Sequence, residues 1–164
     1  DYAREQTKST INEARRALWD MRHDDDLDLV AAIRAMVEQA GRDHPSIAIT
    51  LDAAQPLWAF SSSAHEVLMS VREALYNAIQ HSGSDRVEVR VDQNRGGNIS
   101  ISVTDHGAGF DPERLPDGHY GLIGMRERMA KLHGQLTLRS MAGKGTTVTL
   151  SFHLESSRVH RNGE

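Results

Sequence analysis

Apolar side chains recur every three or four residues in several segments of the chain, the spacing that places them on one face of an amphipathic helix. This pattern predicts helices over residues 11–21, 27–40, 63–82 and 122–132. Gly41, Gly83 and Gly134 stand where the last three helices should end, because glycine is favoured just after a helix. Ser63 and Glu66 have the spacing of a capping box, which predicts that the third helix begins at Ser63.

Two segments alternate between apolar and polar side chains, as a half-buried strand does. They cover residues 87–91 and 99–103, and the loop between them contains Gly96-Gly97, so a β-hairpin is predicted. Shorter apolar runs predict further strands over residues 47–51, 57–60, 136–138 and 148–154. The last two of these strands are joined by a turn through Gly143-Lys144-Gly145.

Length and composition narrow the class of protein. With 164 residues, 38% hydrophobic and 26% charged, the chain has room for about one domain with a real core. No apolar run approaches the roughly 20 residues of a membrane-spanning helix, so we expect a soluble segment that does not enter a membrane. The absence of cysteine excludes disulfides and thiolate metal sites and favours an intracellular location. A net charge of -4 argues against a direct nucleic-acid partner.

The chain begins at Asp1 with neither a methionine nor a signal-type segment, which indicates an internal fragment of a longer protein. The acidic run from His23 to Asp26 interrupts the helical spacing, and we interpret it as a hinge. We therefore divide the chain into a helical arm and hinge over residues 1–26, one domain over residues 27–154, and a flexible tail over residues 155–164.

Three polar residues spaced by four lie together on the third predicted helix, roughly opposite its apolar face. They are Glu73, Asn77 and His81. A carboxylate, an amide and an imidazole in one row can hold a divalent cation or the oxygens of a triphosphate. Taken alone, such a row more often belongs to an ordinary solvated helix face.

Asp105 continues the inward phase of the strand predicted over residues 99–103. A carboxylate on the core side costs several kcal/mol unless it is hydrogen-bonded or paired, so it should have a dedicated partner. Gly107 and Gly109 follow, and backbone without side chains can approach a flat ligand while Asp105 accepts from an exocyclic amine. The alternative is a strand end that turns outward, with Asp105 as an ordinary turn residue.

Gly118, Gly121 and Gly124 lead straight into the fourth predicted helix. Unpaired N–H groups at a helix N-terminus attract an anion, which favours phosphate binding. His119 would then reach a phosphate, or else pack on the loop. A lone G-x-x-G fits a flexible connection equally well, and neither a Walker lysine pattern nor a strand-anchored G-x-G-x-x-G supports a P-loop or Rossmann site.

In this order, the motifs resemble those of the ATP-binding domain of sensor histidine kinases, within the gyrase, Hsp90, histidine kinase and MutL superfamily. The resemblance extends over roughly residues 27–154. Four segments of this chain are similar to the conserved boxes of that domain. They are Arg72 to His81 (N box), Asp105 to Phe110 (first glycine box), Gly121 to Arg128 (second glycine box) and Gly143 to Thr146 (late G-x-G-T element). The G-L-x-G-M-x-E-R form of the second glycine box resembles kinases that signal to helix-turn-helix response regulators.

The resemblance implies an α+β fold, a two-layer α/β sandwich in which helices cover one face of a mixed β-sheet. The nucleotide is then expected between the helical layer and a lid. Between Phe110 and Tyr120 there is room only for a short lid. A short lid suits this subfamily and departs from kinases that have a long lid and a separate phenylalanine motif.

The resemblance also implies roles at the site, with ATP and Mg²⁺ as cofactors. Asn77 is expected to ligate Mg²⁺, and Glu73 to be the catalytic acid that polarises the acceptor or positions a magnesium-bound water. Asp105 is expected to receive the adenine amine, and Thr146 to lie near the adenine, through a water. The other implied nucleotide contacts are His81, Gly107, Gly109, His119, Gly121, Leu122 and Gly124.

A kinase of this kind transfers the γ-phosphoryl group of ATP to a histidine on a separate dimerising hairpin, and its partner is a cognate response regulator. His23 has the His-acid pairing of an acceptor but stands beside the hinge, so we expect the acceptor upstream of Asp1. Residues 1–22 would be the end of the hairpin's second helix. The parent is expected to be membrane-anchored, with this segment in the cytoplasm, and to form a homodimer through the missing helices.

Two alternatives stay open. A transfer-inactive nucleotide-binding regulatory module has no need of both Glu73 and Asn77, so their presence argues against it. An anti-sigma serine kinase shares the fold, but the helical arm and the sequence from Met125 to Arg128 favour the histidine kinase. Because the acceptor histidine is expected upstream of Asp1, the fragment is expected to bind ATP without phosphorylating itself in cis.

Overall fold

We describe a computed structural model of the chain over residues 26–112 and 120–154. Its helices are α2 (Leu29–Asp43), α3 (Ser61–His81) and α4 (Tyr120–Lys131). Its strands are β1 (Asp26–Asp28), β2 (Ala48–Ala53), β3 (Trp58–Phe60), β4 (Arg86–Gln93), β5 (Asn98–Asp105), β6 (Gln135–Met141) and β7 (Gly145–His153). The predicted arm, hinge and tail lie outside the described residues, except for Asp26 at the end of the hinge.

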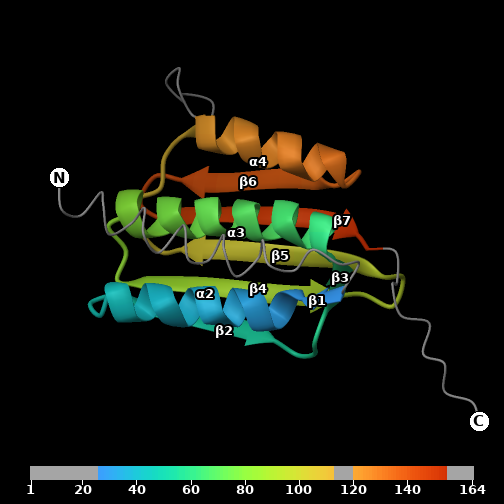
Figure 1. Cartoon of the computed structure of the whole chain (residues 1–164). Coiled ribbons are helices and arrows are strands. Elements are labelled where there is room, and N and C mark those ends of the chain that lie inside the picture. Colours follow the sequence, from blue (N-terminus) through green and yellow to red (C-terminus); the bar gives the residue numbers. More distant parts are fainter. Residues whose placement is uncertain (1–25, 113–119, 155–164) are drawn as a thin grey trace, which may run out of the picture.

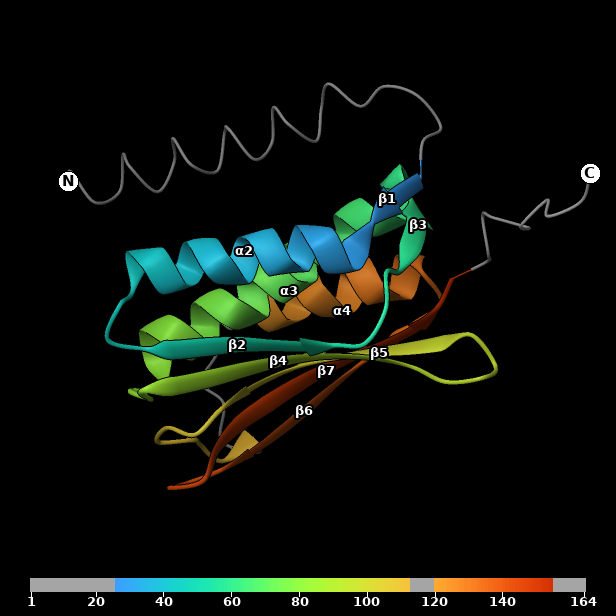
Figure 2. The same cartoon turned by 90° about the horizontal axis from the view of Figure 1, so that it is seen from below.

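A mixed sheet with the strand order β2-β4-β5-β7-β6 forms one layer, and α2, α3 and α4 cover one of its faces (Figures 1 and 2). β2 pairs in parallel with β4, and the other neighbours pair antiparallel. β1 and β3 form a separate two-stranded antiparallel sheet. The expected two-layer α+β sandwich is confirmed, and so are both predicted hairpins, β4-β5 and β6-β7.

The core lies between the helices and the inward positions of the central strands. Val89, Ile101 and Leu150 are almost fully buried on the sheet, and Val67 and Val71 on α3. Burying each side chain of this size contributes about 1.5–3 kcal/mol relative to leaving it exposed. This packing holds α3 over the middle of the sheet, between α2 and α4 (Figure 1).

The inward face of the sheet changes from apolar to polar side chains near the end of β5. One row across β6, β7, β5 and β4 is apolar and consists of Leu138, Val148, Val103 and Val89. The next row toward the β6–β7 turn consists of Ser140, Thr146, Asp105 and Val87. We call Ser140, Thr146 and Asp105 the polar row; they occupy positions where the sheet pattern otherwise places core side chains.

The opposite face of the sheet is polar. On it, Arg90 of β4 donates two hydrogen bonds to Asp52 of β2, at 3.0 and 2.8 Å. The hydrogen bond to the Asp52 carboxylate raises the pKa of Arg90 above its ordinary value. This ion pair links the parallel edge strand to its neighbour on the side away from the helices.

The start of α3 differs from the sequence prediction. The helix begins at Ser61, its N-cap is Phe60, and no side chain caps it, so the predicted capping box of Ser63 and Glu66 is wrong. The reason is tertiary: β3 pairs with β1 up to Phe60 and passes directly into the helix. Glu66 instead accepts a hydrogen bond from Lys131 of α4, at 2.9 Å.

The predicted ends of α2 also need correction. α2 begins at Leu29 instead of Leu27, because Asp28 caps it by accepting from the N–H of Val30 at 3.0 Å. Gly41 does not end this helix, which continues to Asp43.

The other two helices, α3 and α4, end shortly before the predicted glycines. Gly83 follows α3 with a φ of 65°, as predicted. Beyond α4, the left-handed residue is His133, and the N–H of Gly134 donates to the carbonyl of Met129. Among the described helices, none is long and apolar enough to cross a membrane.

Candidate functional site

A cavity of about 560 Å³ lies between α3, the start of α4 and the inward face of the sheet. It brings together residues of all the predicted motifs. The predicted site residues that line it are Glu73, Asn77, His81, Asp105, Gly109, Gly121, Leu122 and Thr146. His119 lies outside the described residues. We call this space the α3–α4 cavity.

The row on α3 reaches the cavity because the opposite side of this helix is committed to the core. Ala74 and Ala78 are buried beside the row, whereas Glu73 and Asn77 are half-buried and His81 is exposed. The spacing by four keeps the three polar side chains on one flank over two helical turns. The row is therefore not an ordinary solvated face, because two of its three members are partly withdrawn from water along a cavity.

Asp105 is only 5% exposed, and it has the dedicated partner that its inward position requires. The backbone N–H groups of Gly107 and Thr146 donate to its Oδ1 at 3.0 and 3.3 Å. Its other oxygen, Oδ2, has no hydrogen-bond partner among the described residues. A buried carboxylate at a cavity wall thus keeps acceptor capacity for a ligand.

Backbone contacts hold the loop after β5 against the β6–β7 turn. A Cβ on Gly109, which has a φ of 58°, would lie 2.0 Å from the carbonyl oxygen of Met141. A Cβ on Gly145 would lie 2.1 Å from the carbonyl oxygen of Asp105. The N–H of Gly143 also donates to Ala108 at 2.6 Å. Only glycine allows this approach, which keeps Asp105 and Thr146 together at the cavity.

Gly107 and Gly124, which were also predicted as contacts, do not line the cavity. A Cβ on Gly107 would lie 2.0 Å from the carbonyl oxygen of Ser82, so this glycine lets the loop pack on the end of α3. Gly124 lies inside α4, where a Cβ would meet the Arg128 guanidinium at 3.3 Å. Both glycines shape the elements around the cavity.

Gly121 places the first turn of α4 directly against Glu73. A Cβ at this position would lie 2.2 Å from Glu73 Oε1. Because that oxygen is at the end of a flexible side chain, a larger residue would displace the carboxylate instead of blocking the helix. The glycine at 121 therefore determines where the Glu73 carboxylate lies in the cavity.

The donor set at α3 fits a magnesium ion that is shared with a phosphate ligand. Among the described residues, no group of three or more His, Cys, Asp or Glu side chains could hold a metal ion unaided. Glu73 and Asn77 offer a carboxylate and an amide oxygen one turn apart. Mg²⁺ is commonly held by one or two carboxylates together with water and substrate phosphates.

Sequence reasoning missed several cavity residues. Leu138 and Val148 line it but follow the ordinary core pattern, so nothing in the sequence sets them apart. Ser140, which lies beside the cavity without lining it, was also missed, although it does carry a signal. It continues the inward phase of Leu136 and Leu138 on β6, where an apolar residue is expected.

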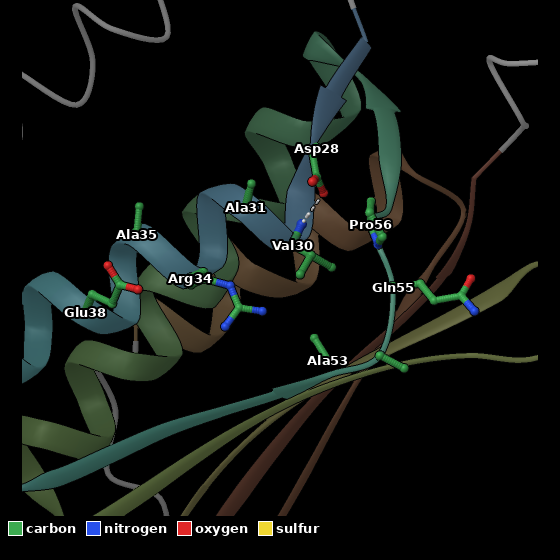
Figure 3. A pocket seen from close by; sticks show the side chains of 10 residues that line it. Asp28, Val30, Ala31, Arg34, Ala35, Glu38, Ala53, Gln55 and Pro56 are labelled. Atoms are coloured by element: carbon green, nitrogen blue, oxygen red, sulfur yellow. Dashed lines mark hydrogen bonds between the residues drawn. The ribbon is translucent and has the colours of Figure 1, made fainter.

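A second hollow, of about 380 Å³, lies between α2 and the β2–β3 connection, and we call it the α2 hollow. Figure 3 shows the Arg34 side chain extending from α2 into it. Arg34, Ala35 and Glu38 are all exposed, and no residue of the predicted motifs lines this hollow.

The sandwich and the α3–α4 cavity define the class of the chain as an ATP-binding domain of the gyrase and histidine kinase type. The family described as histidine kinase-, DNA gyrase B-, and HSP90-like ATPase matches residues 63–156, and the chain belongs to this family. The resemblance of the four motifs is thereby confirmed.

Its curated relatives are sensor kinases. The chain is 35% identical to the nitrate/nitrite sensor protein NarQ of Escherichia coli (strain K12) over 126 residues, which are 76% of this chain and 22% of NarQ. It is 30% identical over 151 residues to the signal transduction histidine-protein kinase/phosphatase DegS of Brevibacillus brevis, covering 90% of this chain and 39% of DegS. The chain thus spans well under half the length of these relatives.

Solved structures share the fold. The histidine kinase domain of the blue-light activated kinase EL346 from Erythrobacter litoralis superposes with a TM-score of 0.74 at 23% identity, covering 87% of this chain and 72% of that domain. The mycobacterial sensor histidine kinase MprB gives a TM-score of 0.65 at 21% identity, covering 81% of this chain and 99% of that one.

Proposed function

We propose that this chain is the catalytic domain of a sensor histidine kinase, which transfers the γ-phosphoryl group of ATP to a histidine on a separate helical hairpin. One observation carries the proposal: the α3–α4 cavity combines a buried carboxylate that has an unused oxygen with an acid and an amide one helical turn apart. The buried carboxylate suits a base with an amino group, and the acid–amide pair on α3 suits a magnesium-bound triphosphate.

In this proposal the polar row holds the adenine. Asp105 Oδ2 accepts a hydrogen bond from the exocyclic amine, and Thr146 lies beside it on the neighbouring strand. Gly109 keeps the backbone close to the base, and Gly107 supports the loop that carries it. Gly121, Leu122 and Gly124 belong to the start of α4, where helix N–H groups and the helix dipole attract phosphate. His81 and His119 are the basic residues assigned to the phosphates.

Glu73 and Asn77 act where the γ-phosphate is expected. Mg²⁺, when bound, neutralises charge on the triphosphate, and Asn77 offers its amide oxygen to the ion. The Glu73 carboxylate accepts a hydrogen bond from one ring nitrogen of the acceptor histidine, which makes the other nitrogen more nucleophilic. That nitrogen forms the new bond to phosphorus, the bond to the bridging oxygen breaks, and ADP leaves.

The partners proposed for the whole protein follow from this reaction. They are the dimerisation and phosphoacceptor hairpin of the parent, a second copy bound through that hairpin, and a cognate response regulator. Residues 1–26 would be the end of the hairpin and its hinge. A cytoplasmic position for this domain, in a membrane-anchored parent, stays part of the same proposal.

A transfer assay tests the proposal. The chain is mixed with Mg²⁺, γ-labelled ATP and a separately made hairpin from the parent. The proposal predicts acid-labile label on the hairpin, as phosphohistidine gives. Acid-stable label on serine would indicate the anti-sigma type of kinase, and normal ATP binding without transfer would indicate a regulatory module. Glu73→Gln is the matched control, since it keeps the shape of the side chain and should bind ATP without supporting transfer.

A further inference from the structure

Ser140 contacts two of the residues that form the cavity wall, although it does not line the cavity itself. Its Oγ accepts a hydrogen bond from the N–H of Phe110 at 2.9 Å and lies 2.8 Å from Thr146 Oγ1. It also donates to the carbonyl oxygen of Gly145 at 3.2 Å. The Ser140 hydroxyl therefore connects the edge strand β6 to the loop after β5, through Phe110, and to its neighbour in the polar row, Thr146.

One assignment of the hydroxyl hydrogens is compatible with all three contacts. A serine hydroxyl has one hydrogen and two lone pairs. A carbonyl can only accept and an N–H can only donate, so the Ser140 hydrogen points to Gly145 and one lone pair receives Phe110. The second lone pair then receives the hydrogen of Thr146. This assignment satisfies all three contacts at once.

Thr146 is therefore left with lone pairs alone for a ligand. Its neighbour across the strands, Asp105, likewise offers only an acceptor at Oδ2. Cross-strand partners hold their Cβ atoms about 4.5–5.5 Å apart, so both acceptors serve one edge of a bound ring. An amino group at that edge has hydrogens to donate, whereas a carbonyl oxygen there would meet two acceptors.

We propose that Ser140 is a positioning residue that orients the Thr146 hydroxyl as an acceptor, so that the cavity prefers a purine with an amino group at position 6 over one with a carbonyl. This inference rests on the proposed function, because it requires the base to lie against Asp105. It deepens that function by naming the residue through which part of the base selectivity is set.

Calorimetric titration of the full chain with ATP and with inosine triphosphate tests the inference. Inosine triphosphate carries a carbonyl oxygen in place of the amino group of ATP at position 6. In Ser140→Ala the Thr146 hydroxyl is free to turn and donate, so the affinity ratio of ATP to inosine triphosphate should fall about 3- to 10-fold, the range of one hydrogen bond. Ser140→Thr should keep the wild-type ratio, and so should Thr137→Ala, on the outer face of the same strand.

A ratio in Ser140→Ala equal to that of wild type would overturn the inference, even if both nucleotides bound more weakly. Thr146→Val gives a second test, and the single variant does not depend on the folding of Ser140→Ala. It removes the same acceptor, so it should lower the ratio, and adding Ser140→Ala should lower it no further. Full additivity of the two changes, or no effect of Thr146→Val, would contradict a role exerted through Thr146.

The same titrations separate this inference from the proposed function. If Asp105→Ala binds ATP as tightly as wild type, the base does not lie on the polar row and the proposed function fails. If Asp105→Ala weakens ATP binding while Ser140→Ala keeps the wild-type ratio, the inference alone fails.

Discussion

The α3–α4 cavity and the α2 hollow are both bounded by a helix on one side, but they differ in the polar groups at their walls. In the α3–α4 cavity, Asp105 is 5% exposed and one of its oxygens has no partner among the described residues. In the α2 hollow, Arg34 and Glu38 are exposed to water, and Asp28 is only half-buried and accepts from the N–H groups of Val30 and Leu57. A buried acceptor with unused capacity is costly unless a ligand completes it, whereas a solvated charge costs little.

The two hollows also differ in the glycines at their walls. At the α3–α4 cavity, a Cβ on Gly109 or Gly121 would lie within 2.2 Å of a backbone or carboxylate oxygen. No glycine lines the α2 hollow. The comparison teaches that volume alone does not define a site in this molecule; close backbone approach combined with unused buried polarity does.

The largest effect is expected from Gly109→Ala. Residue 109 has a left-handed backbone conformation, and the new Cβ would meet the Met141 carbonyl. We therefore expect the free energy of unfolding, measured in urea, to fall by about 2–4 kcal/mol, and ATP binding to weaken as well. Gly143→Ala is the matched control, because its φ is 76° and no atom lies within 4 Å of its Cβ. There we expect only the left-handed strain of about 1–2 kcal/mol. Equal losses in the two variants would mean that the close approach is not needed.

Asp105→Ala should weaken ATP binding by about 1–3 kcal/mol, because a charge-assisted hydrogen bond to the base is lost. The measurement is calorimetry at constant salt and Mg²⁺. Asp52→Ala, which removes an exposed aspartate from β2, should bind ATP like wild type. If wild type and Asp105→Ala bind equally, the adenine is not held by this carboxylate.

Asn77→Ala should reduce the contribution of Mg²⁺ to nucleotide affinity by about 1 kcal/mol, with the fold intact. The affinity for ATP is measured in Mg²⁺ and in EDTA. Gln80→Ala, an exposed position one turn away on α3, should leave the difference between the two conditions unchanged. A metal role for Asn77 is ruled out if its replacement lowers both affinities by the same factor.

The smallest effect is expected in the α2 hollow. Arg34→Ala should change the unfolding free energy by no more than about 0.5 kcal/mol, as for an exposed side chain, and should leave ATP affinity unchanged. The check is the same pair of titrations, with urea and with ATP. Weakened ATP binding in this variant would remove the distinction between the two hollows.

Local periodicity was sufficient to predict much of the site. A spacing of four brought Glu73, Asn77 and His81 to one flank of α3, and the period of two turned Asp105 inward. Both features depend only on the geometry of a single element. The fold class followed from the ordered motifs through the resemblance to a family.

Features that depend on contacts between distant segments could not be predicted. The capping box at Ser63 failed because the pairing of β1 with β3 sets where α3 begins, and Lys131 takes Glu66 as its partner. The role of Ser140 depends on the register of β6 with β7 and on a loop residue, Phe110, that is 30 positions away. No pattern within one strand contains that information.

The most direct test of the central claim is an amide NMR titration of the full chain with Mg²⁺ and ATP, which locates the bound nucleotide by the resonances that shift. The account predicts the largest shifts at the N–H groups of Gly107 and Thr146, which hold Asp105, and at Gly121 beside Glu73. It predicts no comparable shifts at Val30 or Ala53 in the α2 hollow. Shifts concentrated at the α2 hollow, or none at the two amides that hold Asp105, would contradict it.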